Sequence, residues 1–592
     1  MAKKRKRKGR HRGGDEQAAR DAPPVTEKGS KADTGFQAGP RRTSAPAGTE
    51  ERPGDRTAFD SVRENLEAFL IAVILAVIIR HFAVEAFEIP TGSMANTLYG
   101  IHAWLECPNC STEYNVALKS DAAGQVSVDK RDMLVYDGEC SNPSCTLRLH
   151  SRGPRGNELR HPGGPVSCAS CGTLLPGESA NYRRTRVVEH ATRCPMCDFK
   201  HRAVVELKPG DLWSLWSTAT IYGGNKILVT KFAYSLGKPE RWDVIVFTFD
   251  QWKNYIKRLV GLPGEQINIW DGDLYVNGKV EMKSKHPYIQ NALWRNISSS
   301  DLAERGLNEV PAWMEVAPPG GGRQPGVEKN ASWNPTEKRW SLNSLPDTTR
   351  IEYQRPFDNY YSYNLLGPSG GIEGNPSHVS IGDRKVAFTV KVPEAKREGW
   401  VGAEIRDGDF TFQLRIPVGA PSAERPAVIE RVRGEGQEEI QIEGLRATHL
   451  SAIPLNTTTP IEFENVDDRV VARLNGEEIL ALEYASFPQG ASFVDPPMPP
   501  SQEPGAQYLR VVVSGAQAEL ESIRVYRDMY YVPLNRHGHW TGIQLGDDEY
   551  FALGDNGPSS ADGRYWGALP GRNLMGKALL VFWPGMQCKF IR

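Results

Sequence analysis

Two short segments, far apart in the chain, carry residue types that could supply a nucleophile and a base. The first is Gly92-Ser93-Met94, whose hydroxyl could act as a nucleophile. The second is 254–264, where alternation places Lys257 on one face of a predicted strand. A serine hydroxyl needs a base near neutral pH, and a lysine can serve once burial lowers its pKa from about 10.4. Taken alone, a serine beside a glycine is more often a turn residue, and a lysine on an apolar strand face is either a charge at a sheet edge or a group desolvated for catalysis.

A third segment, 553–567, is dense in small and polar residues. This composition is typical of a loop that lines a site. The segment contains Asp555, Asn556, Ser560, Asp562 and Arg564.

Charge and hydropathy restrict the class of protein. The formal net charge is −1, which argues against a nucleic-acid partner. The mean hydropathy of −0.47 excludes a polytopic membrane protein but not a single span. Residues 1–63 hold 16 Lys and Arg against 9 Asp and Glu, and we expect a disordered basic cytoplasmic tail there.

An apolar run follows this tail. Residues 69–79 are uninterrupted apolar, and the run extends from Leu66 to Val84 if Arg80 reaches the interface. We predict a transmembrane anchor helix over 64–84, and a buried globular helix is the alternative. The basic flank favours a cytoplasmic N-terminus and an extracytoplasmic remainder.

Together with the strand-like segments 227–234 and 241–247, these motifs resemble the bacterial type I signal peptidases (leader peptidases), a Ser–Lys serine protease family. The resemblance covers roughly 64–100, 221–285 and 545–584. It implies a membrane-anchored serine endopeptidase that removes N-terminal signal peptides from exported preproteins. The implied fold is mainly β, a signal-peptidase-type catalytic β-domain on one N-terminal transmembrane helix.

The resemblance also implies residue roles. Ser93 is the nucleophile, Lys257 is the general base, and Ser560 orients the Lys257 amine. The backbone N–H of Ser93 and the hydroxyl of Thr91 form the oxyanion hole. The residues that support the site are Asp555, Asn556, Asp562 and Arg564. The residues that line pockets for the small side chains before the cut are Phe87, Ile89 and Ile256. No cofactor is implied for catalysis.

The chain departs from the family pattern at several positions. Asn96 stands where the family usually has Pro, and Trp242 where it has Gly. Gly-Pro-Ser at 557–559 replaces Arg-Asp-Asn, and Gly563 replaces Ser. None of these changes removes a group of the dyad, but they affect the loop that carries Ser560.

Eight of the nine cysteines lie in a first insertion, 101–220. They form four close pairs: Cys107 and Cys110, Cys140 and Cys145, Cys168 and Cys171, and Cys194 and Cys197. This spacing predicts two zinc-ribbon-like sites with about two structural zinc ions. Four disulfides are the alternative, since the region should face an oxidising compartment.

A second insertion, 286–544, reads as β structure. Its alternating stretches and the Asn475-Gly476 hairpin signal resemble a concanavalin/laminin-G-like β-sandwich. Such a domain binds a glycan or protein ligand or serves as a spacer. The catalytic β-domain is then assembled from 85–100, 221–285 and 545–592.

The expected localisation is the cell (plasma or inner) membrane, with a single pass. The expected partners are secretory preproteins with small residues before the cut, the lipid bilayer and a ligand of the second insertion. Two other functions stay open: a self-cleaving Ser–Lys protease and a non-catalytic membrane-anchored surface binding scaffold. The apolar span argues against the former, and the intact polar set argues against the latter.

Overall fold

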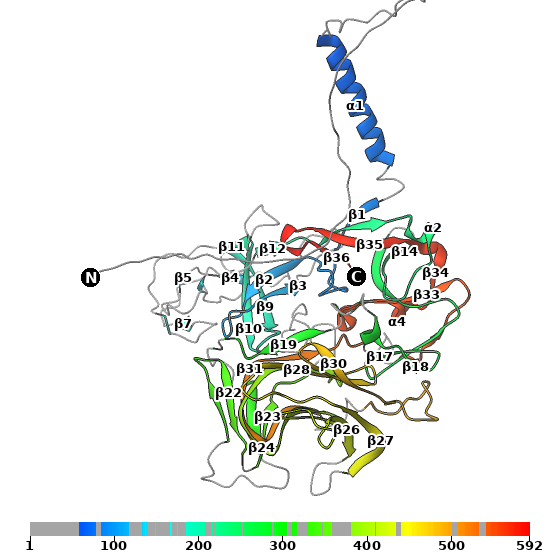
Figure 1. Cartoon of the computed structure of the whole chain (residues 1–592). Coiled ribbons are helices and arrows are strands. Elements are labelled where there is room, and N and C mark those ends of the chain that lie inside the picture. The colour runs from blue at the N-terminus through cyan, green and yellow to red at the C-terminus, as the bar shows by residue number, and fades with distance from the viewer. Residues whose placement is uncertain are drawn as a thin grey trace, which may run out of the picture. The chain divides into compact units, whose positions relative to one another are not determined.

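The computed structural model is mainly β, as expected (Figure 1). It describes residues 58–78, 84–117, 185–207, 215–216, 220–250, 253–286, 289, 292, 294–302, 304, 311–316, 330–345, 347–357, 380–408, 410–433, 440–499, 507–531 and 540–591. It also describes the short strands β4 (Met133–Val135), β5 (Gly138–Glu139), β6 (Arg148–Leu149), β7 (Val166–Ser167) and β8 (Leu174–Leu175). The expected tail, 1–63, falls outside these residues up to 57.

Helix α1 spans Ala58–Ile78. It starts earlier and ends earlier than the predicted helix over 64–84. Val84 instead opens strand β1 (Val84–Glu88), where it pairs with Thr230 of a neighbouring strand. The large apolar side chains of the second half of α1, from Phe69 to Val77, are exposed where they are described.

Among the helices of the described residues, none is both long enough and apolar enough to cross a membrane.

An antiparallel sheet carries the two segments that hold Ser93 and Lys257. Its strand order is β1-β13-β35-β14-β15-β33-β34, with β36 paired to β35. The further strands are β13 (Lys226–Thr230), β14 (Val244–Asp250), β15 (Lys253–Gly261), β33 (Glu549–Leu553), β34 (Leu569–Pro570), β35 (Leu574–Trp583) and β36 (Lys589–Phe590). The strands come from three stretches of the chain, so both insertions leave this sheet and return to it.

A smaller sheet packs beside it. Its order is β18-β17-β16-β32, formed by β16 (Gln266–Trp270), β17 (Asp273–Val276), β18 (Lys279–Val280) and β32 (Ile543–Gln544). Apolar side chains of β15, β16 and β33 share one buried cluster, which includes Val260, Ile267 and Phe551. The short helices are α2 (Ala233–Leu236) and α4 (Gly563–Trp566) and the 3₁₀-helices η2 (Lys283–Lys285), η4 (Gly557–Ser559), η5 (Gly571–Asn573) and η6 (Gly585–Gln587).

The cysteine-rich region contributes two larger sheets and, among its described residues, the two-stranded sheets β5-β6 and β7-β8. One larger sheet has the order β12-β2-β3, from β2 (His102–Glu106), β3 (Glu113–Ala117) and β12 (Thr220–Tyr222). The other has the order β11-β10-β9-β4, from β9 (Thr185–Arg193), β10 (Lys200–Leu207) and β11 (Leu215–Trp216) with β4. The hairpins β2–β3 and β9–β10 each carry one Cys-x2-Cys pair at their turn.

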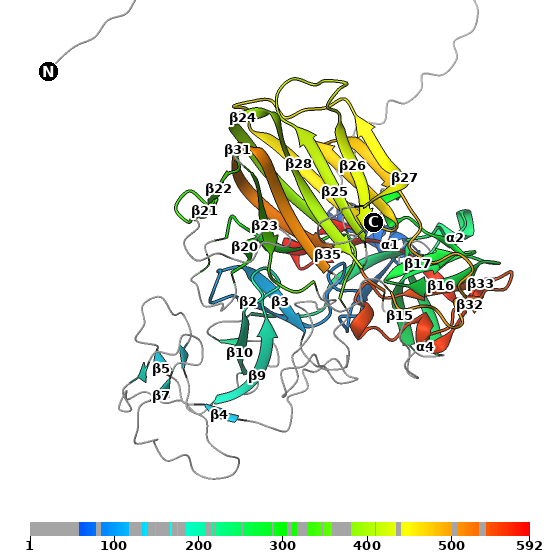
Figure 2. The same cartoon turned by 90° about the horizontal axis from the view of Figure 1, so that it is seen from below.

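The region of the second insertion forms a 13-stranded sheet among the described residues. Figure 2 shows its long strands β31, β24, β28, β25, β26 and β27 as neighbours. Side chains alternate as the sequence predicts: Val386, Phe388 and Val390 are buried in one core. Asn475 and Gly476 both have positive φ in the turn between β29 and β30, as the hairpin signal requires.

The bounds of these strands are β19 (Arg295–Ser299), β20 (Trp313–Val316), β21 (Ala331–Asn334), β22 (Arg339–Asn343), β23 (Thr348–Tyr353), β24 (Arg384–Asp407), β25 (Phe410–Pro417), β26 (Ala427–Arg433), β27 (Ile440–His449), β28 (Thr459–Val466), β29 (Arg469–Leu474), β30 (Glu477–Glu483) and β31 (Gln507–Arg527).

A buried charge cluster joins this sheet to the β17–β18 hairpin. The ammonium group of Lys283 is fully buried and lies 3.2 Å from Asp273 Oδ1 and 2.9 Å from Asp528 Oδ2. It also pairs with Asp467. Burial and the neighbouring carboxylates raise the pKa of Asp528 to about 7, although Lys283 opposes this. The ammonium group of Lys283 is thus the shared counter-charge of several buried carboxylates.

We predict that Lys283→Met strongly destabilises the protein, because it leaves buried carboxylates without a counter-charge. Breaking a buried ion pair from one side costs about 3–5 kcal/mol. The matched control is Lys285→Met, which removes only an exposed ion pair with Glu483 (2.6 Å) and should cost less than about 1 kcal/mol. The measurement is the urea midpoint of the purified full chain.

The loss of stability caused by Lys283→Met, relative to the wild-type protein, should become smaller as the pH falls from 8 to 5. Carboxyl groups with a raised pKa take up protons in the folded state over this range, which removes the unpaired charge. Equal urea midpoints for the two variants at pH 8 would contradict the assignment of a buried counter-ion.

Candidate functional site

Ser93 and Lys257, 164 positions apart, meet in the structure. Lys257 Nζ donates a hydrogen bond of 2.7 Å to Ser93 Oγ and another of 2.9 Å to the carbonyl oxygen of Ile256. Both side chains belong to buried residues, with relative exposures of 8% for Ser93 and 3% for Lys257. Ser93 lies in a tight turn after β1, and Lys257 lies in the middle of β15. The predicted pair is therefore brought together away from bulk water.

Burial is the main influence on the Lys257 amine. It lowers the pKa of Lys257 to about 8, while the charges of Asp562 and Asp555 act in the opposite direction. Among the described residues, no carboxylate lies within ion-pair distance of Lys257. A neutral amine therefore exists at accessible pH, and its lone pair can accept the Ser93 proton.

The next residue on β15 has the opposite environment. Arg258 is fully buried and forms two hydrogen bonds with Asp555, Nε to Oδ1 at 2.7 Å and Nη2 to Oδ2 at 2.6 Å. Burial alone would raise the pKa of Asp555, but the charge and hydrogen bonds of Arg258 hold that pKa below its usual value. The Thr97 hydroxyl also donates to Asp555. This ion pair therefore ties β15 to the segment that follows Ser93.

Asn556 holds the backbone of the Ser93 turn. Its N–H donates to the carbonyl oxygen of Ser93 and its Nδ2 to that of Gly92, both at 3.0 Å. Gly554 is needed for this close approach. A Cβ at Gly554 would lie 2.2 Å from Ser560 Oγ and 2.5 Å from the Ser93 carbonyl oxygen, closer than any real contact. The Gly-Asp-Asn segment thus positions the serine.

Asp562 and Arg564 pair as the resemblance implies. Arg564 Nη2 lies 2.8 Å from Asp562 Oδ2, and both side chains are buried. Asp562 also accepts from the backbone N–H of Gly554 (3.0 Å) and caps α4. The guanidinium donates to the carbonyl oxygen of Gly557 (2.9 Å), so the pair holds both ends of this loop.

Ser560 is buried, and its Oγ forms no hydrogen bond among the described residues, with Lys257 included. The hydroxyl lies over the Cα of Gly554. Gly557 to Ser559, which precede it, form η4.

The remaining predicted residues surround the turn. The backbone N–H of Ser93 has no acceptor among the described residues, while Thr91 is exposed. Ile89 is buried, and Phe87 and Ile256 are partly buried against the same apolar cluster as Ile89. The three predicted pocket residues therefore lie together, and a free N–H is present where an oxyanion hole is expected.

Trp242, at a position where the resemblance expects glycine, adopts φ = 74°. This left-handed conformation is strained for a bulky residue. It is held because the indole is buried in the core shared by β15 and β16. In addition, the Trp242 carbonyl oxygen accepts from Arg258 Nη1 (2.8 Å). The substitution is thus accommodated beneath the Arg258–Asp555 pair.

Four of the eight paired cysteines form one cluster. The Sγ atoms of Cys107 and Cys197 are 3.5 Å apart, and those of Cys110 and Cys194 are 3.7 Å apart. All four sulfurs lie within 4.8 Å of one another, and none forms a disulfide. Tetrahedral zinc–sulfur bonds of about 2.3 Å place neighbouring sulfurs about 3.8 Å apart, so this donor set fits a metal ion.

The two turns have the same local geometry. The backbone N–H of Cys107 donates to Thr112 O, and that of Cys194 donates to Phe199 O, each at 2.9 Å. Cys140, Cys145, Cys168 and Cys171 lie outside the described residues. The spacing predicted metal sites, but only the structure pairs the first Cys-x2-Cys turn with the fourth.

Sequence reasoning missed three functional positions. Arg258 and Thr97 were not singled out, although both contact Asp555, and neither was Gly554. Adjacency to Lys257 and Asp555 was the only signal available for Arg258 and Gly554. Nothing in the sequence indicated that Thr97 would meet a residue 458 positions away.

Solved structures resemble this chain only weakly. The exoplasmic/lumenal domain of VIP36 in its Ca2+/Man2-bound form has a TM-score of 0.24 and 11% identity, covering 40% of this chain and 90% of that domain. The carbohydrate-binding module CBM66 of Bacillus subtilis has a TM-score of 0.21 and 10% identity, covering 36% and 95%. Similarity at this level carries no argument about a ligand.

Sequence comparisons match part of the chain. The family described as "Signal peptidase, peptidase S26" matches residues 210–315 and 510–583, which include Lys257 and Ser560 but not Ser93. Signal peptidase I of Bacillus caldolyticus is 34% identical over 115 residues, 19% of this chain and 61% of that protein. Signal peptidase I V of Bacillus subtilis (strain 168) is 45% identical over 97 residues, 16% and 56%.

The chain thus spans a little over half the length of these two curated relatives. The matched segments contain β14, β15 and β33 and the loop that follows β33. Over residues 210–315 and 510–583, these matches confirm the resemblance to the signal peptidase family, peptidase S26, that was drawn from the sequence motifs.

Proposed function

We propose that the chain is a serine endopeptidase that removes N-terminal signal peptides from exported preproteins. The observation that carries this proposal is the 2.7 Å hydrogen bond between Lys257 Nζ and Ser93 Oγ in a buried site. The match to the signal peptidase family supports the reaction class. The names of the relatives support the substrate class.

The chemistry follows from the contacts of the two groups. Neutral Lys257 takes the proton of Ser93 Oγ as that oxygen attacks the carbonyl carbon of the scissile bond. The negative charge that develops on the carbonyl oxygen is stabilised by the free backbone N–H of Ser93. Protonated Lys257 then gives its proton to the leaving amine, and water hydrolyses the acyl-enzyme by the reverse proton path. No cofactor takes part.

The substrate contacts follow from the cluster beside the nucleophile. Phe87 and Ile89 lie on or next to the edge strand β1, and Ile256 precedes the base. As the resemblance implies, we infer that these apolar side chains line the pockets for small substrate residues at the first and third positions before the cut. Strand β1 pairs with β13 on one side, so its other edge can pair with an extended peptide.

We also propose the membrane, metal and insertion roles expected from the sequence. The exposed apolar half of α1, with the residues up to 84, anchors the chain in a bilayer. The four clustered cysteines hold a structural zinc ion, whose charge offsets the buried thiolates. The 13-stranded sheet with its single large apolar core is a β-sandwich that binds a glycan or protein or acts as a spacer.

The dyad is tested by substitution. Ser93→Ala and Lys257→Ala should each lower cleavage of a preprotein with an Ala-x-Ala site by roughly 10⁴- to 10⁶-fold, without additivity, because the two groups act as one unit. The matched controls are Ser235→Ala, which alters an exposed serine, and Lys253→Ala, which alters an exposed lysine on the same strand as the base. The measurement is kcat/KM of the purified full chain in detergent.

Both controls should keep wild-type activity. Full activity of Ser93→Ala would remove the nucleophile assignment, and inactivity of the wild-type protein towards preproteins would favour the scaffold alternative. Cleavage of the chain itself, lost in Ser93→Ala, with no preprotein cleavage would favour the self-cleaving alternative.

The pH profile tests the state of the base. Burial lowers the pKa of Lys257 to about 8, and only the neutral amine is active. We therefore expect kcat/KM to fall about tenfold per pH unit below this value and to level off above it. Lys253→Ala should show the same acid limb, whereas a profile that is flat from pH 6 to 9 would contradict a lysine base.

Metal content tests the cysteine sites. We expect about two zinc ions per full chain, one held by the described cluster and one by the other four cysteines. Cys194→Ser should lose about one equivalent and increase local proteolysis near residue 194, because structural zinc supplies folding energy. Cys588→Ser is the control, since this exposed cysteine lies outside the cluster. Disulfides in place of zinc in the purified protein would refute the assignment.

A further inference from the structure

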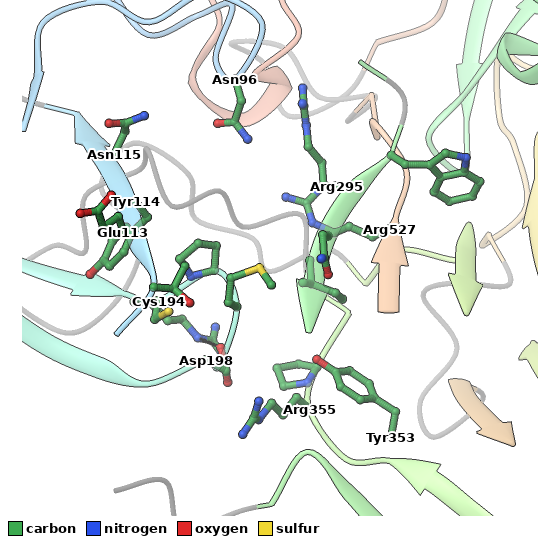
Figure 3. Close-up of a pocket in the computed structure, with 18 of the residues that line it drawn as sticks. Asn96, Glu113, Tyr114, Asn115, Cys194, Asp198, Arg295, Tyr353, Arg355 and Arg527 are labelled. Carbon is green, nitrogen blue, oxygen red and sulfur yellow. Dashed lines mark hydrogen bonds and ion pairs between the residues drawn. The ribbon is translucent and has the colours of Figure 1, made fainter. Parts of the chain in front are cut away.

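A pocket of about 380 Å³ lies behind the nucleophile turn (Figure 3). The cysteine turns line one wall with Glu113, Cys194 and Asp198, and Arg295 and Arg527 lie opposite them. Asn96, from the turn that carries Ser93, closes another side. Ser93 and Lys257 do not line this pocket, so it is distinct from the peptidase site.

The charge of the lining is strongly unbalanced. Four arginines line the pocket, Arg193, Arg295, Arg355 and Arg527, against the carboxylates of Glu113 and Asp198. Arg193 and Asp198 offset each other in an ion pair, and Arg355 is paired with Glu304. Arginines still outnumber the lining carboxylates, and an excess of positive charge favours an anionic ligand.

Two of the arginines present unused donors. Nε and Nη2 of Arg295, and Nε and Nη1 of Arg355, are buried atoms without a hydrogen-bond partner among the described residues. Arg355 is 5% exposed, and its Nη2 is held by Glu304 at 2.6 Å. Buried donors without acceptors are costly and rare in native proteins, so these atoms point to an acceptor that a ligand supplies.

A structural role, offsetting the charge of the cysteine cluster, explains Arg355 but not Arg295. Arg355 lies close enough to Cys197 for the thiolate charge to act on it, and it can offset the charge of the cysteine cluster. Arg295 is different, because it forms no ion pair within the described residues and its charge acts on Tyr99 and Asp555. The charge of its guanidinium group thus acts on the pocket and on the turn that carries Ser93, and not on the cysteine cluster.

We propose that this pocket binds a phosphate-class oxyanion, held by the guanidinium groups of Arg295 and Arg355. The two groups come from different elements, β19 and the segment after β23, and both line the pocket. A tetrahedral dianion offers oxygens in several directions to such a pair. A carboxylate offers only two oxygens in one plane. The ligand is inorganic phosphate or the phosphomonoester headgroup of a lipid, which share this chemistry.

Occupancy of the pocket stabilises the turn that carries Ser93. Asn96 and Tyr99 both line the pocket, and Thr97 between them is bonded to Asp555. An anion bound there therefore holds the far side of the same turn whose near side is held by Asn556. This inference concerns binding and does not depend on the proposed peptidase activity.

The test is a calorimetric titration of the full chain in detergent with inorganic phosphate at constant ionic strength. Arg295→Gln should weaken phosphate binding roughly 10- to 100-fold, as expected when charged hydrogen bonds are lost. The matched control is Arg524→Gln on β31. It removes a surface ion pair with Asp301 (3.2 Å), lies outside the pocket, and should bind phosphate as the wild-type protein does.

Arg295→Lys keeps the charge but loses the planar fork, so it should bind with intermediate affinity. This variant separates loss of binding from loss of folding. Competition by phosphatidic acid in phosphatidylcholine vesicles, dependent on Arg295, identifies a lipid headgroup as the source. Phosphate binding unaffected by these vesicles identifies free phosphate. No saturable binding by the wild-type protein, or unchanged affinity of Arg295→Gln, overturns the proposal.

Discussion

Two adjacent basic residues of β15 are both buried, but only one of them has a carboxylate partner. The candidate site depends on this difference. Successive side chains of a strand point to opposite faces. On one face Arg258 is neutralised by Asp555 through two hydrogen bonds, so its charge is kept. On the other face Lys257 contacts a hydroxyl and a carbonyl oxygen but no carboxylate, so burial lowers its pKa to about 8. One strand thereby supplies both a fixed structural charge and a candidate base.

The ion pair also explains how distant segments form one site. Asp555 accepts from Arg258 of β15 and from Thr97 of the nucleophile turn, while the next residue, Asn556, bonds the backbone of that turn. Both insertions lie between these segments in the sequence, yet the closing contacts are all within the peptidase-type sheet and its loops. Long insertions are tolerated in this way because they leave and re-enter at strand ends.

Charge burial also organises the regions outside the dyad. Lys283 serves several carboxylates at the junction with the 13-stranded sheet, where acidic groups are in excess. The pocket behind the nucleophile turn shows the opposite imbalance, with arginines in excess and unused donors. The excess of carboxylates around Lys283 is relieved within the protein, because a carboxyl group with a raised pKa can take up a proton. Guanidinium groups cannot lose their protons at usable pH, so the excess of arginines in the pocket is relieved by a bound anion.

The sequence by itself predicted the mainly β fold, because side chains alternate along its strands, and the resemblance of its motifs to the signal peptidases pointed to a reaction class and to Ser93 and Lys257. It also predicted β structure in the second insertion, and metal-type spacing in the cysteines. Only the tertiary structure decided which cysteine turns meet, that Ser560 forms no hydrogen bond with Lys257 among the described residues, and that Arg258, Thr97 and Gly554 contact or support the turn that carries Ser93. The helix end before Val84 was likewise set by pairing with Thr230 of β13. These features depend on contacts between residues far apart in the chain, which local pattern cannot encode.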